Sequence, residues 1–250
     1  MIEVTRLIKR FGPKAVLRDL DFQVAQGEFV ALLGPNGAGK TTFLRILSSL
    51  SRQTFGEVRI AGYALPQQAA AVRRSLGVVS HLPLLYGDLS AEENLVFYGR
   101  MYGVPAMHQR VSEVLELIGL AARRSDLVRT FSRGMQQRLA IARAVLHDPE
   151  VLLLDEPHTG LDQDACEMLD TVLRQVAARG RTVVMTSHDL ARVADLASRF
   201  DVLTRGRIQA SIQQSDLPTD GLLTFYRQAL ANSTARALVP DPLGEVKEKA

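Results

Sequence analysis

One glycine-rich stretch constrains the fold of this chain more than any other feature. It follows the apolar run Phe29–Leu33 and precedes Phe43–Leu47, whose spacing of apolar residues is typical of a helix. Its residues are Gly34, Pro35, Asn36, Gly37, Ala38, Gly39, Lys40, Thr41 and Thr42. A strand, a glycine loop and a helix form a phosphate-binding P-loop, because glycines let backbone N–H groups surround a phosphate and the helix dipole attracts the same anion. The stretch therefore predicts nucleotide binding.

Two side chains of this loop suit the chemistry of a nucleoside triphosphate. Lys40 brings a positive charge for the β- and γ-phosphates, and the Thr41 hydroxyl is a suitable ligand for Mg²⁺. Glycine turns between a strand and a helix are common, but few of them carry this lysine and threonine. We therefore expect Lys40 to clamp phosphates and Thr41 to hold the metal ion.

A second apolar segment ends in two carboxylates. Val151–Leu154 is predicted to be a buried strand, so Asp155 emerges at the edge of the sheet where ligands bind. Asp155 can hold Mg²⁺, and Glu156 can polarise a water molecule for in-line attack on the γ-phosphate. A strand that ends in an acidic turn is common, but beside a P-loop it favours a catalytic site.

Two further segments have both a functional and a purely structural interpretation. His188 follows the apolar strand Thr182–Thr186 and is placed to contact a γ-phosphate, although a lone histidine is more often a surface or capping residue. Ser132, with Gly134 in the first turn, starts a helix whose N-terminus can bind an anion or is simply capped. The P-loop and the carboxylates favour the functional interpretation of both segments.

The composition limits the class of protein. Of 250 residues, 46% are hydrophobic and 23% are charged, which is typical of a globular protein. The net charge of +3 is spread along the chain, which is compatible with a nucleic-acid or membrane-surface partner but demands neither. We expect no nucleic-acid partner. The single cysteine, Cys166, fits a reducing compartment. Without an apolar run of about 18–20 residues or a signal peptide, we expect a cytoplasmic protein that reaches a membrane through a partner.

Strand and helix signals alternate along the chain and predict an α/β fold. Short strands are expected within residues 1–33, and apolar strands alternating with helices indicate a mainly parallel sheet covered on both faces. Ser90 and Glu93 form a capping box that starts a helical stretch, so a helical lobe is expected at about 88–149. Other strands and helices are expected at 57–60, 76–79, 110–117, 164–179 and 202–203. Residues 213–250 are expected to be partly helical and then mobile.

Together these motifs resemble the ATP-binding subunit of an ABC transporter along nearly the whole chain, from Val4 to about Ile212. The resemblance implies a P-loop ATPase domain over 1–212, with an N-terminal antiparallel subdomain, a central sheet and an inserted helical lobe. It implies ATP and Mg²⁺ as ligands. Lys40, Glu156 and His188 correspond to the family's catalytic residues.

Other positions take their roles from this resemblance alone. Ser132 and Gly134 occupy the signature segment, in which Phe131 and Arg133 replace the usual leucine and first glycine. Further family positions are the D-loop residue Asp162, the adenine-stacking position Phe11 and the Q-loop position His81. Phe11 has a strong rival interpretation as a core or turn residue. His81 replaces the usual glutamine, and it is equally well a ligand of metal or water or a spacer.

The resemblance also implies partners. Two copies are expected to pair head-to-tail, each ATP lying between one P-loop and the signature segment of the other copy. Integral-membrane subunits are expected to dock near Tyr86–Leu95, which places the protein on the inner face of the cell membrane. The motifs are most similar to the heme-exporter ATPase of cytochrome c maturation. Another efflux ATPase, or a soluble ABC ATPase of DNA repair or translation, is the alternative.

Overall fold

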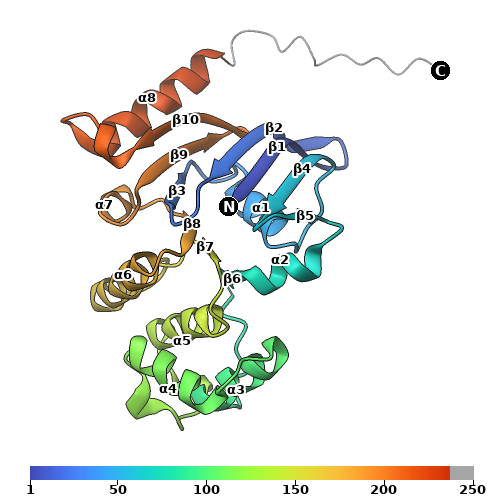
Figure 1. The fold of residues 1–250 in the computed structure, drawn as a ribbon. Coiled ribbons are helices and arrows are strands. Elements are labelled where there is room, and N and C mark those ends of the chain that lie inside the picture. The colour runs from blue at the N-terminus through green and yellow to red at the C-terminus, as the bar shows by residue number, and fades with distance from the viewer. Residues whose placement is uncertain (81, 237–250) are drawn as a thin grey trace.

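Two β-sheets form the framework of the chain. A computed structural model describes residues 1–80 and 82–236 (Figure 1). The first sheet is antiparallel, in the order β2–β1–β4–β5, and contains β1 (Ile2–Phe11), β2 (Lys14–Val24), β4 (Phe55–Ile60) and β5 (Tyr63–Leu65). The second has the order β10–β9–β3–β8–β7–β6, and contains β3 (Phe29–Leu33), β6 (Leu76–Val79), β7 (Val151–Asp155), β8 (Thr182–Thr186), β9 (Arg199–Thr204) and β10 (Arg207–Gln213).

The second sheet is parallel except for β10, which runs antiparallel to β9 at one edge. Eight α-helices lie in the described part of the chain: α1 (Lys40–Leu47), α2 (Ala69–Ser75), α3 (Ala91–Tyr102), α4 (Met107–Leu117), α5 (Arg133–Val145), α6 (Gln163–Ala178), α7 (Leu190–Ala194) and α8 (Gly221–Arg236). Short 3₁₀ turns are η1 (Ala121–Arg123), η2 (Val128–Thr130) and η3 (Gln214–Asp216). Helices α3, α4 and α5 gather at one end of the molecule, away from α8 (Figure 1). The predicted fold class is therefore confirmed: an antiparallel N-terminal sheet, a mainly parallel central sheet and a helical insertion.

The central sheet is apolar on both faces, which explains why its strands read as continuous hydrophobic runs. On β3, Val30 and Leu32 pack with α1 and the antiparallel sheet, whereas Ala31 and Leu33 pack with the helices on the other side. Leu153 and Leu154 on β7 divide in the same way. Because the two faces belong to two different cores, every apolar side chain of these two strands is buried, and only the strand ends are free to bind a ligand.

Several short elements were not predicted from the sequence. Strand β5 has three residues and α7 has five, which is too short for a hydrophobic period to appear. Strand β10 lies at the edge of the sheet, where half-buried residues give a weak pattern.

The capping box at Ser90 is present, since Ser90 and Glu93 exchange hydrogen bonds between side chain and backbone. The expected mobility of the C-terminal tail concerns residues 237–250, which lie outside the described residues.

Candidate active site

One groove of about 1880 Å³ contains the P-loop together with residues from the ends of several strands. Strands β3, β8 and β7 are neighbours, and parallel strands end at the same edge of the sheet. The P-loop follows β3, Asp155 and Glu156 end β7, and His188 follows β8. The topology therefore brings together residues more than a hundred positions apart in the sequence.

The P-loop has a backbone path that needs glycine at its first position. Gly34 has φ of +150°, and a Cβ atom there would lie 2.1 Å from the carbonyl oxygen of Leu203 on β9. Gly39 has φ of +113° and stands directly before the first residue of α1. The loop therefore approaches β9 closely and then turns into the N-terminus of α1, where free N–H groups and the helix dipole favour an anion.

Lys40 is held inside this loop. Its side chain is buried, and Nζ donates a hydrogen bond of 2.6 Å to the carbonyl oxygen of Gly34. Nζ also lies 3.8 Å from Oε1 of Glu156. A buried ammonium group needs such partners, because burial penalises an unpaired charge. The geometry thus fixes one positive charge between the glycine loop and the end of β7.

A pair of oxygen atoms at the end of β7 fits a magnesium ion. Oγ1 of Thr41 lies 3.3 Å from Oδ1 of Asp155, and Oγ1 of Thr186 donates a hydrogen bond of 2.8 Å to the same carboxylate oxygen. Mg²⁺ prefers hard oxygen ligands and is held in nucleotide sites by one or two protein groups together with phosphates and water. Thr41 and Asp155 therefore fit this ion, and Thr186 orients the carboxylate.

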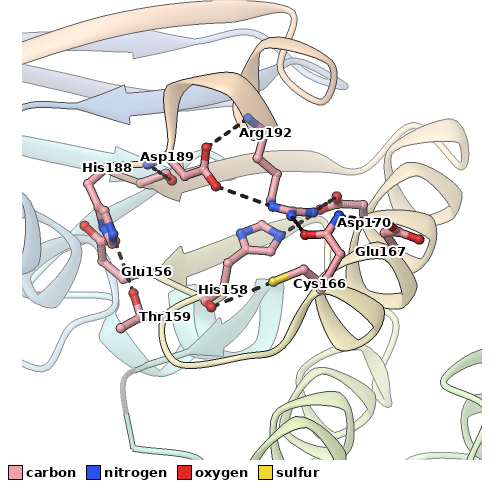
Figure 2. A network of polar contacts seen from close by, with 11 residues as sticks. Glu156, His158, Thr159, Cys166, Glu167, Asp170, His188, Asp189 and Arg192 are labelled. Carbon is pink, nitrogen blue, oxygen red and sulfur yellow. Dashed lines mark hydrogen bonds and ion pairs between the residues drawn. The ribbon is translucent and has the colours of Figure 1, made fainter.

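Glu156 sits at a strained position between two cationic or polar groups. Its φ is +51°, in the left-handed region that residues with a Cβ rarely occupy. Its backbone N–H donates to Oγ1 of Thr186 at 2.9 Å, which holds this conformation. Oε2 lies 2.5 Å from Nδ1 of His188 and 3.5 Å from Oγ1 of Thr159 (Figure 2). The carboxylate is thus aimed from two sides, by Lys40 and by His188.

The remaining predicted site residues do not line this groove in the described part of the chain. Ser132 caps α5 through its Oγ, and Asp162 caps α6 through Oδ1, 2.8 Å from the N–H of Ala165. Gly134 lies in the first turn of α5. Phe11 is exposed at the end of β1, with Nζ of Lys9 4.7 Å from its ring centre. His81, the expected Q-loop position, lies outside the described residues.

Some residues of the site were missed by sequence reasoning. Thr186 contacts Asp155 at the end of β7 and Glu156 directly after it. Its one signal in the sequence was a polar side chain at the end of an apolar strand. Thr159 belongs to the segment that resembles the D-loop, in which a role was expected only for Asp162, and its hydroxyl contacts Glu156. Arg133, which replaces a glycine of the signature, lines the groove together with Gln136.

Among residues 1–80 and 82–236, none of the helices has the length and apolarity needed to cross a membrane.

Known proteins resemble this chain in sequence and in structure. The family model described as "ABC transporter" matches residues 17–159. A linearmycin resistance ATP-binding protein of Bacillus subtilis is 37% identical over 87% of this chain and 70% of its own length. A Nod factor export ATP-binding protein of Paraburkholderia xenovorans is 40% identical over 82% of this chain and 68% of its own length.

Solved structures agree with these sequence matches. An ATP-binding subunit of an ABC transporter superposes with a TM-score of 0.84 and 31% identity over 92% of this chain and 99% of that chain. A dimeric ATP-binding cassette, MJ0796, in a post-hydrolysis state with ADP and Pi superposes with a TM-score of 0.78 and 28% identity over 86% of this chain and 99% of that chain. The P-loop, the acidic end of β7 and these matches lead to one conclusion: the chain belongs to the ABC transporter family and is an ATP-hydrolysing ABC cassette.

Proposed function

We propose that this chain is the ATPase subunit of an ABC exporter, working as a two-fold pair beneath integral-membrane subunits. The observation that carries the proposal is the cluster of Lys40, Glu156 and His188 at the P-loop, since it places a cation suited to phosphate beside a carboxylate suited to activating water. The export direction is supported by relatives named for Nod factor export.

The proposed mechanism assigns one task to each of these side chains. Lys40 neutralises the negative charge of the β- and γ-phosphates. Glu156 accepts a hydrogen bond from the attacking water and takes its proton as the water oxygen bonds to the γ-phosphorus, while the bond from that phosphorus to the β–γ bridging oxygen breaks and ADP leaves with the electron pair. His188 holds Glu156 through the 2.5 Å contact. Its proposed contact with the γ-phosphate is taken from the family. Thr41 and Asp155 would hold Mg²⁺, which would supply further neutralisation of the phosphate charge.

Pairing of two copies completes each site in this proposal. Ser132 and Arg133 are exposed at the start of α5, where free backbone N–H groups can receive the phosphates of ATP bound to the other copy. The dimeric cassette structures that this chain resembles support such a pair. Asp162, at the start of α6, and Phe11 take their proposed roles, a contact to the partner and adenine stacking, from the family alone.

The cargo belongs to the membrane subunits in this proposal. Heme export was the expectation from the sequence, and the relatives reported above, named for linearmycin resistance and Nod factor export, give it no support. The proposal is therefore limited to an exporter whose substrate contacts lie outside this chain. The proposed location, at the cytoplasmic side of a membrane, follows from that partnership.

Magnesium dependence tests the proposed chemistry directly. ATP hydrolysis by the purified chain is expected to fall to background with excess EDTA and to return when Mg²⁺ is added in excess, because Thr41 and Asp155 offer only two oxygen groups and need the ion to neutralise the phosphates. Phosphate release over time measures this. Equal turnover with EDTA and with Mg²⁺ would contradict the assignment of Thr41 and Asp155.

A second groove, of about 660 Å³, lies on α3 and is the proposed docking site of the membrane subunit. Phe97 and Met101 line it and are exposed, and Tyr86 meets Phe97 edge-on at 5.1 Å between ring centres. Exposed apolar side chains in contact with one another indicate a protein interface. This groove borders the loop that was predicted to dock the partner.

The docking surface gives a prediction that separates hydrolysis from coupling. Met101→Lys is expected to leave ATP turnover of the isolated chain within twofold. It is expected to abolish co-purification with the membrane subunits, because docking would bury an unpaired lysine charge in the groove. The matched control is Met168→Lys, since Met168 is also exposed but lies on α6. Equal recovery of the membrane subunits with both variants would rule out this docking site.

A further inference from the structure

A buried polar cluster lies beside Glu156 and His188 and has no part in the mechanism above (Figure 2). Its centre is Asp170 on α6, whose two carboxylate oxygens have different partners. Oδ1 lies 2.7 Å from Nε2 of His158, and Oδ2 accepts a hydrogen bond of 2.7 Å from Nη1 of Arg192. The side chains of His158 and Asp170 are each 8% exposed. The cluster is therefore a network in the protein interior, where the loss of one hydrogen-bond partner leaves a buried polar group unpaired at a large cost in free energy.

The electrostatics of the cluster keep the central carboxylate charged. Burial by itself raises the pKa of Asp170, but the hydrogen bonds from His158 and Arg192 outweigh burial and hold that pKa below its ordinary value. Nδ1 of His158 is buried without a hydrogen-bond partner in the described part of the chain. A proton on Nε2, donated to Asp170, is therefore the arrangement that the geometry supports.

The three residues come from the three segments that surround the catalytic pair. His158 stands two positions after Glu156, in the turn that follows β7, where the Glu156 carbonyl accepts a hydrogen bond from the N–H of Thr159. Arg192 stands on α7, four positions after His188. Asp170 lies on α6, between them. One carboxylate thus ties the segment that carries Glu156 and the segment that carries His188 to the same helix.

Arg192 also fixes the residue next to His188. Its backbone N–H donates to Oδ1 of Asp189 at 3.1 Å, and its Nε lies 3.6 Å from Oδ2 of Asp189. Its Nη2 donates to Oε1 of Gln163 on α6 at 3.0 Å. The N–H of Asp189 in turn donates to Oγ of Ser187. Asp189, the residue after His188, is therefore hydrogen-bonded to Ser187 before it and to Arg192, and Arg192 is bonded to α6.

His188 itself has little to hold its ring. Its side chain is 66% exposed, and the polar contact that the structure gives it within the described residues is the one to Glu156. An exposed ring is positioned by its backbone and not by packing. The 2.5 Å contact between His188 and Glu156 thus depends on how the two loops are anchored. The cluster around Asp170 is the anchor that the two loops share, in addition to the hydrogen bond from the Glu156 N–H to Thr186.

We propose that His158 is a positioning residue, which acts through Asp170 and Arg192 to hold His188 against Glu156. The inference rests on the proposed function of these two residues in ATP hydrolysis. A small displacement of a catalytic group reduces turnover without changing phosphate binding, since Lys40 and the P-loop are not part of the cluster. The proposal therefore concerns the kcat of ATP hydrolysis and leaves its KM unchanged.

Three variants of His158 test whether the hydrogen bond from Nε2 to Asp170 is needed for turnover. His158→Ala is expected to lower kcat about tenfold and to leave KM for ATP within twofold. His158→Gln places an amide N–H near the position of Nε2 and is expected to recover at least half of the wild-type kcat. His158→Asn places its amide near Nδ1, too short to reach Asp170, and is expected to behave like the alanine variant. Glutamine and asparagine variants with equal kcat would overturn the proposal, and so would an alanine variant with wild-type kcat.

A double-mutant cycle tests whether His158 and Arg192 act through the same carboxylate. The kcat of His158→Ala with Arg192→Lys is expected to match that of the more impaired single variant, because both changes loosen one network. Losses that multiply would contradict the inference. Should the alanine variant not fold, as judged by thermal unfolding, the glutamine and asparagine pair decides. Failure of the proposed function looks different: the wild-type chain would then hydrolyse no ATP, or would do so at the same rate after Glu156→Gln.

Discussion

Replacing Glu156 by glutamine is expected to lower the rate of ATP hydrolysis about a thousandfold while ATP continues to bind. The amide keeps the size and the hydrogen-bonding reach of the side chain but cannot accept a proton from water, and general-base catalysis contributes roughly 10²–10⁴-fold. Binding is expected to persist because Lys40 and the P-loop are unchanged, and because Lys40 loses a carboxylate 3.8 Å away that competes for its charge. Single-turnover phosphate release and equilibrium ATP titration measure the two effects.

The same variant is expected to trap the proposed two-fold pair. If hydrolysis releases the pair, a chain that binds ATP without hydrolysing it stays paired, and size-exclusion chromatography with light scattering will show the mass of two chains in ATP and of one chain without it. Glu150→Gln is the matched control, since Glu150 is an exposed glutamate just before the other end of β7. A turnover of Glu156→Gln within tenfold of wild type would remove Glu156 from the role of base.

The sequence carried enough information to predict that the proposed catalytic residues lie together, because each of them stands at the end of a buried strand. The apolar run before Gly34, the run before Asp155 and the run before His188 became β3, β7 and β8, which are adjacent in the sheet. Parallel strands place their carboxyl ends together, so three local patterns were sufficient to predict one site. The capping box at Ser90 marked the start of the helical insertion by the same local logic.

The anchoring of that centre was beyond local patterns. His158, Asp170 and Arg192 are 12 and 22 positions apart in sequence, and nothing in the sequence near each of them indicates a charged partner. Their contact depends on the rotation of α6 about its own axis. The packing of the apolar face of α6 against the rest of the protein determines that rotation. Asp170 in particular reads as an exposed helical residue, although it is buried. Sequence periodicity cannot show a polar residue that packs on the apolar side of a helix.

The second large effect is expected at Lys40. Lys40→Ala is expected to weaken ATP binding about ten- to a hundredfold, because a charge-assisted hydrogen bond to a phosphate contributes roughly 1.5–3 kcal/mol. The side chain is buried, and the carbonyl oxygens of Gly34 and Pro35 that now accept from Nζ would face the incoming phosphates without a donor between them. Turnover is expected to fall to background as well, since the same charge stabilises the transition state.

Hydrolysis complicates any titration of the wild-type chain, so Lys40→Ala is best measured in the Glu156→Gln background, where bound ATP persists. The control is Arg59→Ala, which removes the same unit of charge from an exposed position on β4 and is expected to leave the dissociation constant within threefold. The two substitutions change the net charge equally. A difference between their dissociation constants for ATP is therefore due to the position of Lys40 and not to the net charge of the protein. Equal dissociation constants for the two double variants would mean that the lysine holds the glycine loop together and that the phosphates are bound by the backbone alone.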